Sequence, residues 1–321
     1  MIQPRYEPVG EDIWCIDTGL YRPKLAACYL IRGGGRLACI DTGTAHTVPL
    51  ILAVMAELGH GPEDLDYVIP THVHLDHAGG AGQLMQACPQ ATLAIHPKGA
   101  PHLIDPTRLI AGATAVYGEA GFAAAYDTLE PVPAERVLEL EDGATLDLGG
   151  RTLTFIDTPG HANHHGCIYD AVTRAWFTGD TFGIAYRELY SEAGPYLFAP
   201  TTPVAFDPDA WQTSLDRLMA LAPQAMYLTH YGRLDDPAGL VETLRLSIRD
   251  QANLALEVAA AGPEGRLERL KVAEAAHLVD GARAHGCTLS DEQIREVLVV
   301  DIDLNAQGLE VWLVRRERRG I

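Results

Sequence analysis

The stretch Thr71-His72-Val73-His74-Leu75-Asp76-His77-Ala78-Gly79-Gly80 contains four potential metal ligands within six residues. In an extended segment, alternate residues point to one face, so His72, His74 and Asp76 converge if the strand that ends at Pro70 continues into an extended loop. Neutral imidazole and carboxylate are ligands of zinc and similar first-row metals. A polar loop with a few hydrogen-bonded histidines is the alternative. Three histidines and an aspartate directly after an apolar strand favour a metal site.

Three further candidate ligands lie far from this stretch, and each follows an apolar run that is typical of a strand. They are His161 after residues 151–156, Asp180 after residues 175–178, and His230 after residues 225–229. Ligands collect at strand ends in layered α/β folds. This shared position supports the three residues more than their residue types do.

Asp41 ends another predicted strand and has two possible roles. It could hold a ligand histidine by the second nitrogen of its ring, or it could only cap the turn, and the residues alone leave both open. Close to His161, we expect His165 to pack or hydrogen-bond beneath the site and His164 to be exposed.

The elements that must position these residues alternate between strands and helices over the first half of the chain. We expect strands at 12–17, 25–31, 36–40, 66–70 and 91–95, and helices at 47–58 and about 77–87. This alternation predicts an α/β fold built in layers. After residue 236 the sequence becomes rich in Ala, Leu, Glu and Arg with helical periodicity, so we predict one domain over 1–236 and a helical C-terminal region over 237–321.

Two irregular segments are candidates for the substrate pocket. Residues 97–136 have many prolines and no clear period, which is typical of a functional insertion; a packing appendage is the alternative. Residues 181–200 follow Asp180 directly and are rich in aromatic side chains. We predict that these segments form the pocket wall and that Tyr186 or Tyr190 faces the metals, where a phenol can pack and hydrogen-bond a leaving group or oxyanion.

Charge and composition exclude some classes of protein. The net charge of −19 argues against a broad nucleic-acid surface, which needs clustered Lys and Arg. The chain has no apolar run of membrane-spanning length, and its start lacks a signal-peptide pattern. Its six cysteines are scattered and form no C-x-x-C pair, so we expect buried thiols in a reducing compartment, the cytoplasm. A homodimer stays an open alternative.

With all seven positions in place, the chain resembles the metallo-β-lactamase-fold hydrolases over about residues 10–235. The resemblance rests on five motifs in the family order: Asp41-Thr42-Gly43, the stretch from His72 to His77, Pro159-Gly160-His161, Gly179-Asp180 and Thr229-His230-Tyr231-Gly232. It implies an αββα sandwich, here with a helical C-terminal extension, in the branch of glyoxalase II-like and lactonase-like enzymes. It also implies a ligand role for each position. His72, His74 and His161 resemble ligands of a first metal, Asp76, His77 and His230 resemble ligands of a second, Asp180 resembles a bridging carboxylate and Asp41 resembles a residue that orients a ligand.

The resemblance implies a hydrolase with two divalent ions, which we expect to be Zn²⁺, with Fe or Mn as alternatives. Such a pair can hold a bridging hydroxide and polarise a substrate oxygen, so Asp76 and Asp180 are also the candidate catalytic carboxylates. We predict cleavage of an ester, thioester or lactone in a small, anionic substrate. A phosphodiesterase and a mononuclear-iron, sulfur dioxygenase-like enzyme are the alternatives, and the complete second ligand set argues against the latter.

Overall fold

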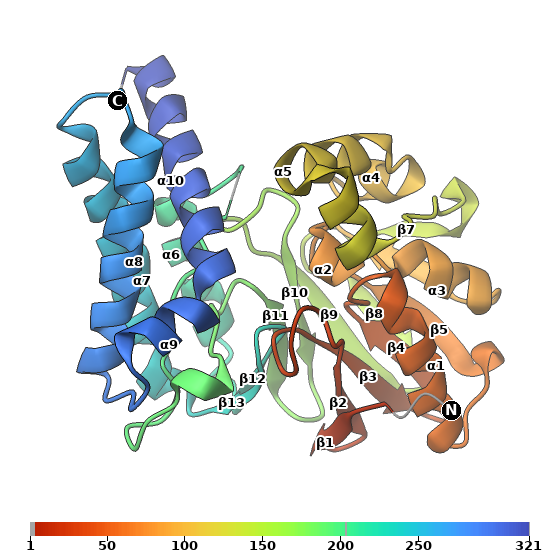
Figure 1. Ribbon diagram of the computed structural model, residues 1–321. Helices are drawn as coiled ribbons and strands as arrows, with labels where there is room; N and C mark the ends of the chain where they lie inside the picture. The colour runs from red at the N-terminus through yellow and green to blue at the C-terminus, as the bar shows by residue number, and fades with distance from the viewer. Residues whose placement is uncertain (1–3, 203, 321) are drawn as a thin grey trace. The chain divides into compact units, whose positions relative to one another are not determined.

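The computed structural model describes residues 4–202 and 204–320 (Figure 1). Within this part of the chain, contacts divide the residues into two compact units. The first is drawn from residues 1–157, 164–179 and 221–235, and the second from 158–163, 180–220 and 236–321. Residues 1–3, the start of the segment that lacks a signal-peptide pattern, lie outside the described residues.

The first unit is built on two β-sheets. The larger sheet has seven strands in the order in which they occur along the chain: β1 (Tyr6–Gly10), β2 (Ile13–Asp17), β3 (Ala27–Gly33), β4 (Arg36–Ile40), β5 (Leu65–Ile69), β6 (Thr92–Ile95) and β7 (Val137–Glu139). Strands β1 to β4 are antiparallel, whereas β4 to β7 run parallel to one another. The loops after β4 and β5 therefore leave the sheet at the same edge.

The second sheet has six strands in the order β13-β12-β11-β10-β9-β8. They are β8 (Thr145–Leu148), β9 (Arg151–Asp157), β10 (Gly166–Asp170), β11 (Ala175–Gly179), β12 (Ala225–Leu228) and β13 (Gly232–Asp235). Only β11 and β12 of these described strands pair in parallel. Asp180 follows β11 and Thr229-His230 follows β12, so these residues leave the second sheet at the same edge.

A continuous apolar core joins side chains of the two sheets. Tyr29 of β3 packs edge-on against Phe177 of β11, with ring centroids 5.3 Å apart, and Phe177 stacks on Tyr227 of β12 at 4.8 Å. These three side chains are almost fully buried and belong to the same cluster as Ile40 and Ile69, the last residues of β4 and β5. The strand ends that carry the site therefore rest on a rigid core.

The outer face of the seven-stranded sheet is covered by helices of the first unit. These are α1 (Val48–Glu57), α2 (Leu75–Ala78), α3 (Ala81–Ala87), α4 (Ala100–Ile104) and α5 (Thr107–Tyr126), with the 3₁₀ turns η1 (Ala45–Thr47), η2 (Pro62–Asp64) and η3 (Ala134–Arg136). Side chains of α1 to α4 form a second core with the strands. The insertion at 97–136 is largely helical, and Gly118 interrupts the helical conformation inside α5.

The helix predicted over about 77–87 is wrong in one respect, because two separate helices occupy this region. The chain breaks at Gly79-Gly80, between α2 and α3. A side chain at Gly80 would meet the carbonyl oxygen of Thr44 at 2.7 Å, so the break lets the loop after β4 pass close to α2. The bridge between Gly43 and Ala78 fixes this approach.

The second unit is helical, and its main part is the C-terminal region. It contains η4 (Arg187–Leu189), α6 (Pro208–Met219), α7 (Pro237–Ala259), α8 (Arg266–Ala284), α9 (Asp291–Val297) and α10 (Val299–Arg319). Helices α8 and α10 are close neighbours in this unit and α7 packs on both. Among the described residues, no helix is both long and apolar enough to span a bilayer.

Candidate metal centre

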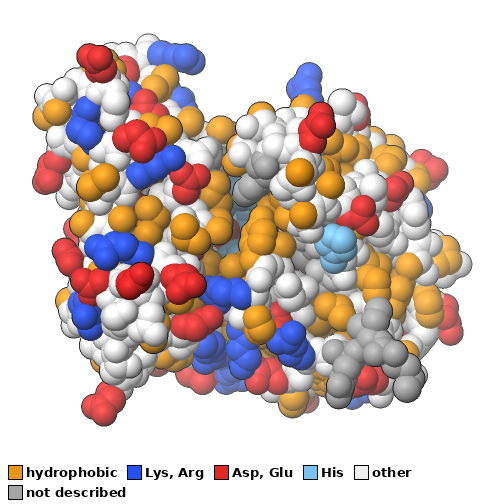
Figure 2. Space-filling view, viewed as in Figure 1, with side chains coloured by type: hydrophobic (Ala, Val, Ile, Leu, Met, Phe, Trp, Pro, Cys, Tyr) orange, Lys and Arg blue, Asp and Glu red, His pale blue; other side chains and the backbone are white. Residues whose placement is uncertain are grey.

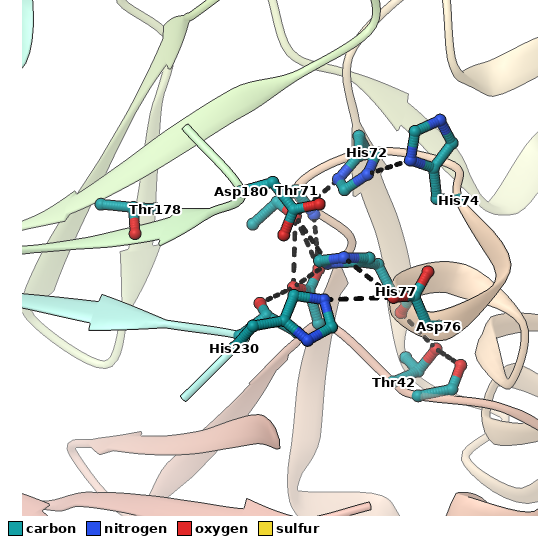
Figure 3. A network of polar contacts seen from close by, with 12 residues as sticks. Thr42, Thr71, His72, His74, Asp76, His77, Thr178, Asp180 and His230 are labelled. Carbon is teal, nitrogen blue, oxygen red and sulfur yellow. Dashed lines mark hydrogen bonds and ion pairs between the residues drawn. The ribbon is translucent and has the colours of Figure 1, made fainter. Parts of the chain in front are cut away.

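Asp76, His77 and His230 form a compact group of potential metal ligands. The first two lie in the single turn of α2, and His230 follows β12. Nε2 of His230 is 3.1 Å from Oδ2 of Asp76, and Nε2 of His77 is 3.6 Å from the same oxygen. The three side chains point toward one another (Figure 3). One ligand atom of each lies within 4.8 Å of the other two, a separation that one metal ion can span.

Asp41 holds His77 from behind. Its Oδ2 atom lies 2.8 Å from Nδ1 of His77, and both side chains are buried. The same carboxylate accepts the backbone N–H of Thr71 at 2.7 Å and the hydroxyl of Thr229 at 2.7 Å. Asp41 has φ of 54°, in the left-handed region that Asp tolerates better than most residues. Asp41 therefore holds the second ring nitrogen of His77 and also fixes the turn after β5 through Thr71.

Two other histidines are fixed in the same manner by backbone carbonyls. Nδ1 of His230 is 2.8 Å from the carbonyl oxygen of Leu25, and Nδ1 of His161 is 2.9 Å from that of Pro200. A carbonyl only accepts a hydrogen bond, so the proton sits on Nδ1 and the lone pair is on Nε2. Metal-binding histidines typically have this arrangement. The donor set therefore fits divalent metal ions.

The other four predicted ligands are divided between the two units, with His72 and His74 in the first and His161 and Asp180 in the second. Nε2 of His72 is 2.8 Å from Nδ1 of His74, and Nε2 of His161 is 3.2 Å from Oδ2 of Asp180. Each unit therefore brings two of these four predicted ligands close together.

The residue before Asp180 shows how tightly the strand end is packed. Gly179 ends β11 with φ of 47°. A side chain there would meet Oγ1 of Thr71 at 2.5 Å and Nε2 of His165 at 2.7 Å. Glycine thus permits the turn that leads to Asp180 while the end of β5 lies against it.

His165 and His164 lie near the same histidines of the first unit. The ring of His165 is fully buried and stacks on His72, with centroids 4.7 Å apart. His164 is half-buried rather than exposed, because its ring lies 6.2 Å from that of His72 and 6.1 Å from that of His102. His165 therefore supports a ligand by packing.

The two tyrosines predicted to face the metals differ in their contacts. Tyr186 is buried and its hydroxyl donates to Oδ1 of Asp301 in α10 at 3.1 Å. Tyr190 has a buried hydroxyl with no hydrogen-bond partner among the described residues, and burial raises its pKa although Arg187 acts in the opposite direction. The guanidinium of Arg187 covers its ring at 4.9 Å. A role toward substrate stays a prediction for both.

A cavity of about 420 Å³ lies in the first unit beside the loop after β2. Its lining residues are Thr18, Gly19, Leu20, Tyr21, Thr44, His46, Gly121, Ala124 and Ala125. Helix α5 contributes three small residues and carries only two charged ones, Arg108 and Glu119, so apolar side chains are visible over it (Figure 2). Burial raises the pKa of Tyr21, a hydrogen bond to Tyr126 lowers it, and the charge of Asp76 raises it further.

The sequence analysis missed the residues that fix the ligands. Thr71 and Thr229 both hold Asp41, and the repeated dipeptide Thr-His, at 71–72 and 229–230, is a signal that could have indicated them. The carbonyls of Leu25 and Pro200 left no such signal, since every residue has a backbone carbonyl. Tyr21 was also missed, although its loop directly follows a predicted strand.

Comparison with known proteins agrees with this fold. A model of the metallo-beta-lactamase superfamily matches residues 21–230. The crystal structure of ST1585, an archaeal metallo-beta-lactamase superfamily protein from Sulfolobus tokodaii, aligns with a TM-score of 0.63 at 22% identity, over 94% of this chain and 98% of that one. The structure of TTHA1429 from Thermus thermophilus aligns with a TM-score of 0.62, also at 22% identity, over 90% and 94%. The predicted fold class, a sandwich of two sheets with C-terminal helices, is confirmed.

Curated relatives are distant in sequence. The metallo-beta-lactamase fold-containing protein ST1585 of Sulfurisphaera tokodaii is 28% identical over 254 residues, which cover 78% of this chain and 88% of the relative. The acyl-coenzyme A thioesterase MBLAC2 of Gallus gallus is 29% identical over 187 residues, 54% of this chain and 64% of that protein. The match to the thioesterase thus spans less than two thirds of its length.

Proposed function

Because the chain belongs to the metallo-β-lactamase superfamily, we propose that it is a dinuclear metal-dependent hydrolase of an ester, thioester or lactone. The observation that carries this proposal is the tethering of the ligands. His77, His230 and His161 each have Nδ1 engaged by Asp41, Leu25 or Pro200, which leaves Nε2 to a metal. Zn²⁺ suits this set of imidazole and carboxylate ligands.

Two ions at this site would lower the pKa of a water molecule and polarise the carbonyl of the substrate. The seven ligands carry two negative charges, on Asp76 and Asp180, and five neutral imidazoles. Two dications would retain excess positive charge, which favours an anionic substrate or a carbonyl that develops negative charge. Asp41 supports this by holding His77 in one orientation, since a fixed ligand needs no reorganisation during the reaction.

The cavity beside the loop after β2 supports a substrate with an apolar part. Its walls are mainly small or apolar side chains of this loop and α5, and Thr44 in its lining lies close to Gly80, two residues after the helix that carries Asp76. Lys24 follows on the same loop, is exposed, and brings positive charge to a chain of net charge −19. An acyl thioester with a negatively charged leaving group fits both features, and the similarity to an acyl-coenzyme A thioesterase supports this class.

The test begins with the metal content of protein purified without added metal. Initial rates are then measured on an aryl ester, an acyl-coenzyme A thioester, a lactone and an aryl phosphodiester, before and after removal of metal with a chelator. We expect two divalent ions per chain, turnover of at least one carbonyl substrate, and its loss on chelation.

Two results would contradict the proposal. Turnover of the phosphodiester alone would favour the phosphodiesterase. A single iron per chain together with sulfur-dependent oxygen uptake would favour the dioxygenase.

The variant Asp76→Asn tests the site directly, because it removes the charge of one proposed ligand. Asp64→Asn is its control. Asp64 contacts His60 at 3.1 Å, and this pair is not part of either ligand group.

A further inference from the structure

The carbonyl group of Pro200 orients a metal ligand. It lies 2.9 Å from Nδ1 of His161, whose Nε2 is 3.2 Å from Oδ2 of Asp180. A backbone carbonyl can orient a ring only if its own segment is held. Pro200 has no N–H, so the neighbouring peptide groups of Ala199 and Thr201 must fix the segment.

Side chains of the C-terminal helices hold both neighbours. Ser247 of α7 accepts the N–H of Ala199 at 3.0 Å, and Gln251 of the same helix donates to the carbonyl of Ala199 at 2.7 Å. Asn305 of α10 accepts the N–H of Thr201 at 2.9 Å through its side chain. The hydroxyl of Thr201 donates to the backbone carbonyl of Asn305 at 3.3 Å.

The close approach of α10 to this segment depends on one glycine. A side chain at Gly308 would lie 1.6 Å from the carbonyl oxygen of Thr201, so only glycine allows the helix to pass. The segment 199–201 therefore lies directly against α10, in contact range of Asn305.

Asn305 belongs to a group of buried polar side chains. The side-chain amide of Asn305 donates to Oε1 of Glu274 in α8 at 3.0 Å, and Asn305, Glu274 and Gln251 are all fully buried. Oε2 of Glu274 and Oε1 of Gln251 have no hydrogen-bond partner among the described side chains and backbone. Apolar residues would stabilise a helical core better than such groups. Several buried polar side chains that hydrogen-bond to the same irregular segment indicate that the position of this segment matters for the function of the protein.

We propose that Asn305 and Gln251 are positioning residues for the metal ligand His161, which they hold through the segment Ala199–Thr201. The C-terminal helices thereby act on the metal centre through the carbonyl of Pro200. This inference rests on the proposed metal centre and adds a role for the helical extension. Loss of a partner that orients a ligand typically costs 10–100-fold in metal affinity, and we expect about tenfold here because Asn305 and Gln251 act through the backbone of the segment Ala199–Thr201.

The experiment measures metal binding rather than turnover. Metal-free protein is titrated with Zn²⁺ in competition with a chromophoric chelator, and with Co²⁺ while its absorption is recorded. The variants are Asn305→Leu and Gln251→Leu. The control is Gln307→Leu, because Gln307 lies on α10 and donates to Asp303 at 2.7 Å, in a contact separate from the segment 199–201. Thermal unfolding of each metal-free variant shows that it is folded.

We expect one of the two ions to bind about tenfold more weakly to Asn305→Leu and Gln251→Leu, with a changed Co²⁺ spectrum for that ion and an unchanged second ion. Gln307→Leu should bind like the wild type. Gln251→Leu decides the matter if Asn305→Leu does not fold, because it also removes an acceptor that has no hydrogen-bond partner among the described residues. The inference is overturned if the folded variants bind both ions as the wild type does, or if all three lose affinity equally. Wild-type protein that binds no metal would overturn the metal centre itself, and this inference with it.

Discussion

Thr229 donates its hydroxyl to Oδ2 of Asp41 at 2.7 Å, although the two residues are 188 positions apart in the sequence. Asp41 follows β4 of one sheet and Thr229 follows β12 of the other. Their contact therefore links the edges of the two sheets at the oxygen that also holds His77. The orientation of His77 thus depends on residues from both sheets, and variants of these residues can test it.

Replacing Asp41 by asparagine should weaken metal binding by about 10–100-fold, because the amide lacks the charge that stabilises His77 Nδ1–H and cannot accept all the donors that surround it. Zinc competition with a chelator measures the loss. Asp64→Asn serves as the control, since it alters a different Asp–His contact, with His60. Equal affinities of the two variants would show that Asp41 does not orient a ligand.

Asp180→Ala should lower activity more than Asp41→Ala does. Asp180 is a proposed ligand whose carboxylate lies 3.2 Å from His161, whereas Asp41 acts through His77. The first change removes a ligand, while the second only loosens one, which typically costs 10–100-fold. Metal content and initial rates of the two variants are compared side by side. Wild-type metal content and rate in Asp180→Ala would refute the ligand assignment.

Ala124→Leu should reduce the volume of the cavity beside the loop after β2. Ala124 lines this cavity on α5, and a leucine adds three carbon atoms to its wall. We expect kcat/KM to fall by about tenfold or more for long acyl thioesters and to change little for acetyl esters, because a lost apolar contact of this size is worth about 1–3 kcal/mol. Ala123→Leu, at an exposed position next to it that does not line the cavity, is the control. Equal effects on both chain lengths would exclude this cavity as the acyl site.

Glu274→Gln should change how stability depends on pH. Burial raises the pKa of Glu274 from 4.5 to about 7, its hydrogen bond from Asn305 lowers it, and the charge of Asp301 raises it. The folded state therefore binds the proton of Glu274 more tightly than the unfolded state does. This difference stabilises the folded protein by about 3 kcal/mol below pH 4.5, and the contribution is lost as the pH rises to about 7.

The glutamine variant is neutral at every pH and should not show this loss. Chemical unfolding at pH 5 and pH 8 measures the difference, and Glu264→Gln at an exposed position of the same unit is the control. Parallel pH dependence of wild type and Glu274→Gln would show that the carboxyl group is ionised without cost in the folded protein.

Tyr190→Phe should keep metal content and thermal stability but lower turnover. The hydroxyl of Tyr190 is buried and has no hydrogen-bond partner in the described chain, so its removal breaks no contact there. Tyr186→Phe, in contrast, loses the hydrogen bond to Asp301 and should reduce the free energy of unfolding by about 1 kcal/mol. Full turnover in both variants would rule out a tyrosine that serves the substrate.

The candidate ligands could be proposed from the sequence because each stretch that contains them comes soon after an apolar strand. His72, Asp180 and His230 could be located from the strand pattern without knowledge of the pairing. The helix α5 was harder to foresee, since its many exposed alanines and glycines leave no apolar period. Helix α6 begins at Pro208, and the side chain of Asp207 caps its N-terminus. Proline is tolerated there because the first turn of a helix does not need its N–H.

The partners of the ligands could not be predicted for a different reason. Leu25 and Pro200 act through their carbonyl oxygens, and their side chains carry no trace of this role. The grouping of residues 180–220 with the C-terminal helices depends on contacts such as that of Thr201 with Asn305. Such contacts join polar atoms of residues that are far apart in the sequence, so no short stretch of sequence contains both partners.

The order of the strands along the chain has a consequence for biosynthesis. The histidine-rich stretch after β5 leaves the ribosome early, but Thr229 and His230 follow β12, almost at the end of the first unit. Until they emerge, Asp41 lacks one of its donors and the group of Asp76 and His77 lacks its third member. A nascent chain can therefore complete this group only after nearly all of the two sheets has been translated.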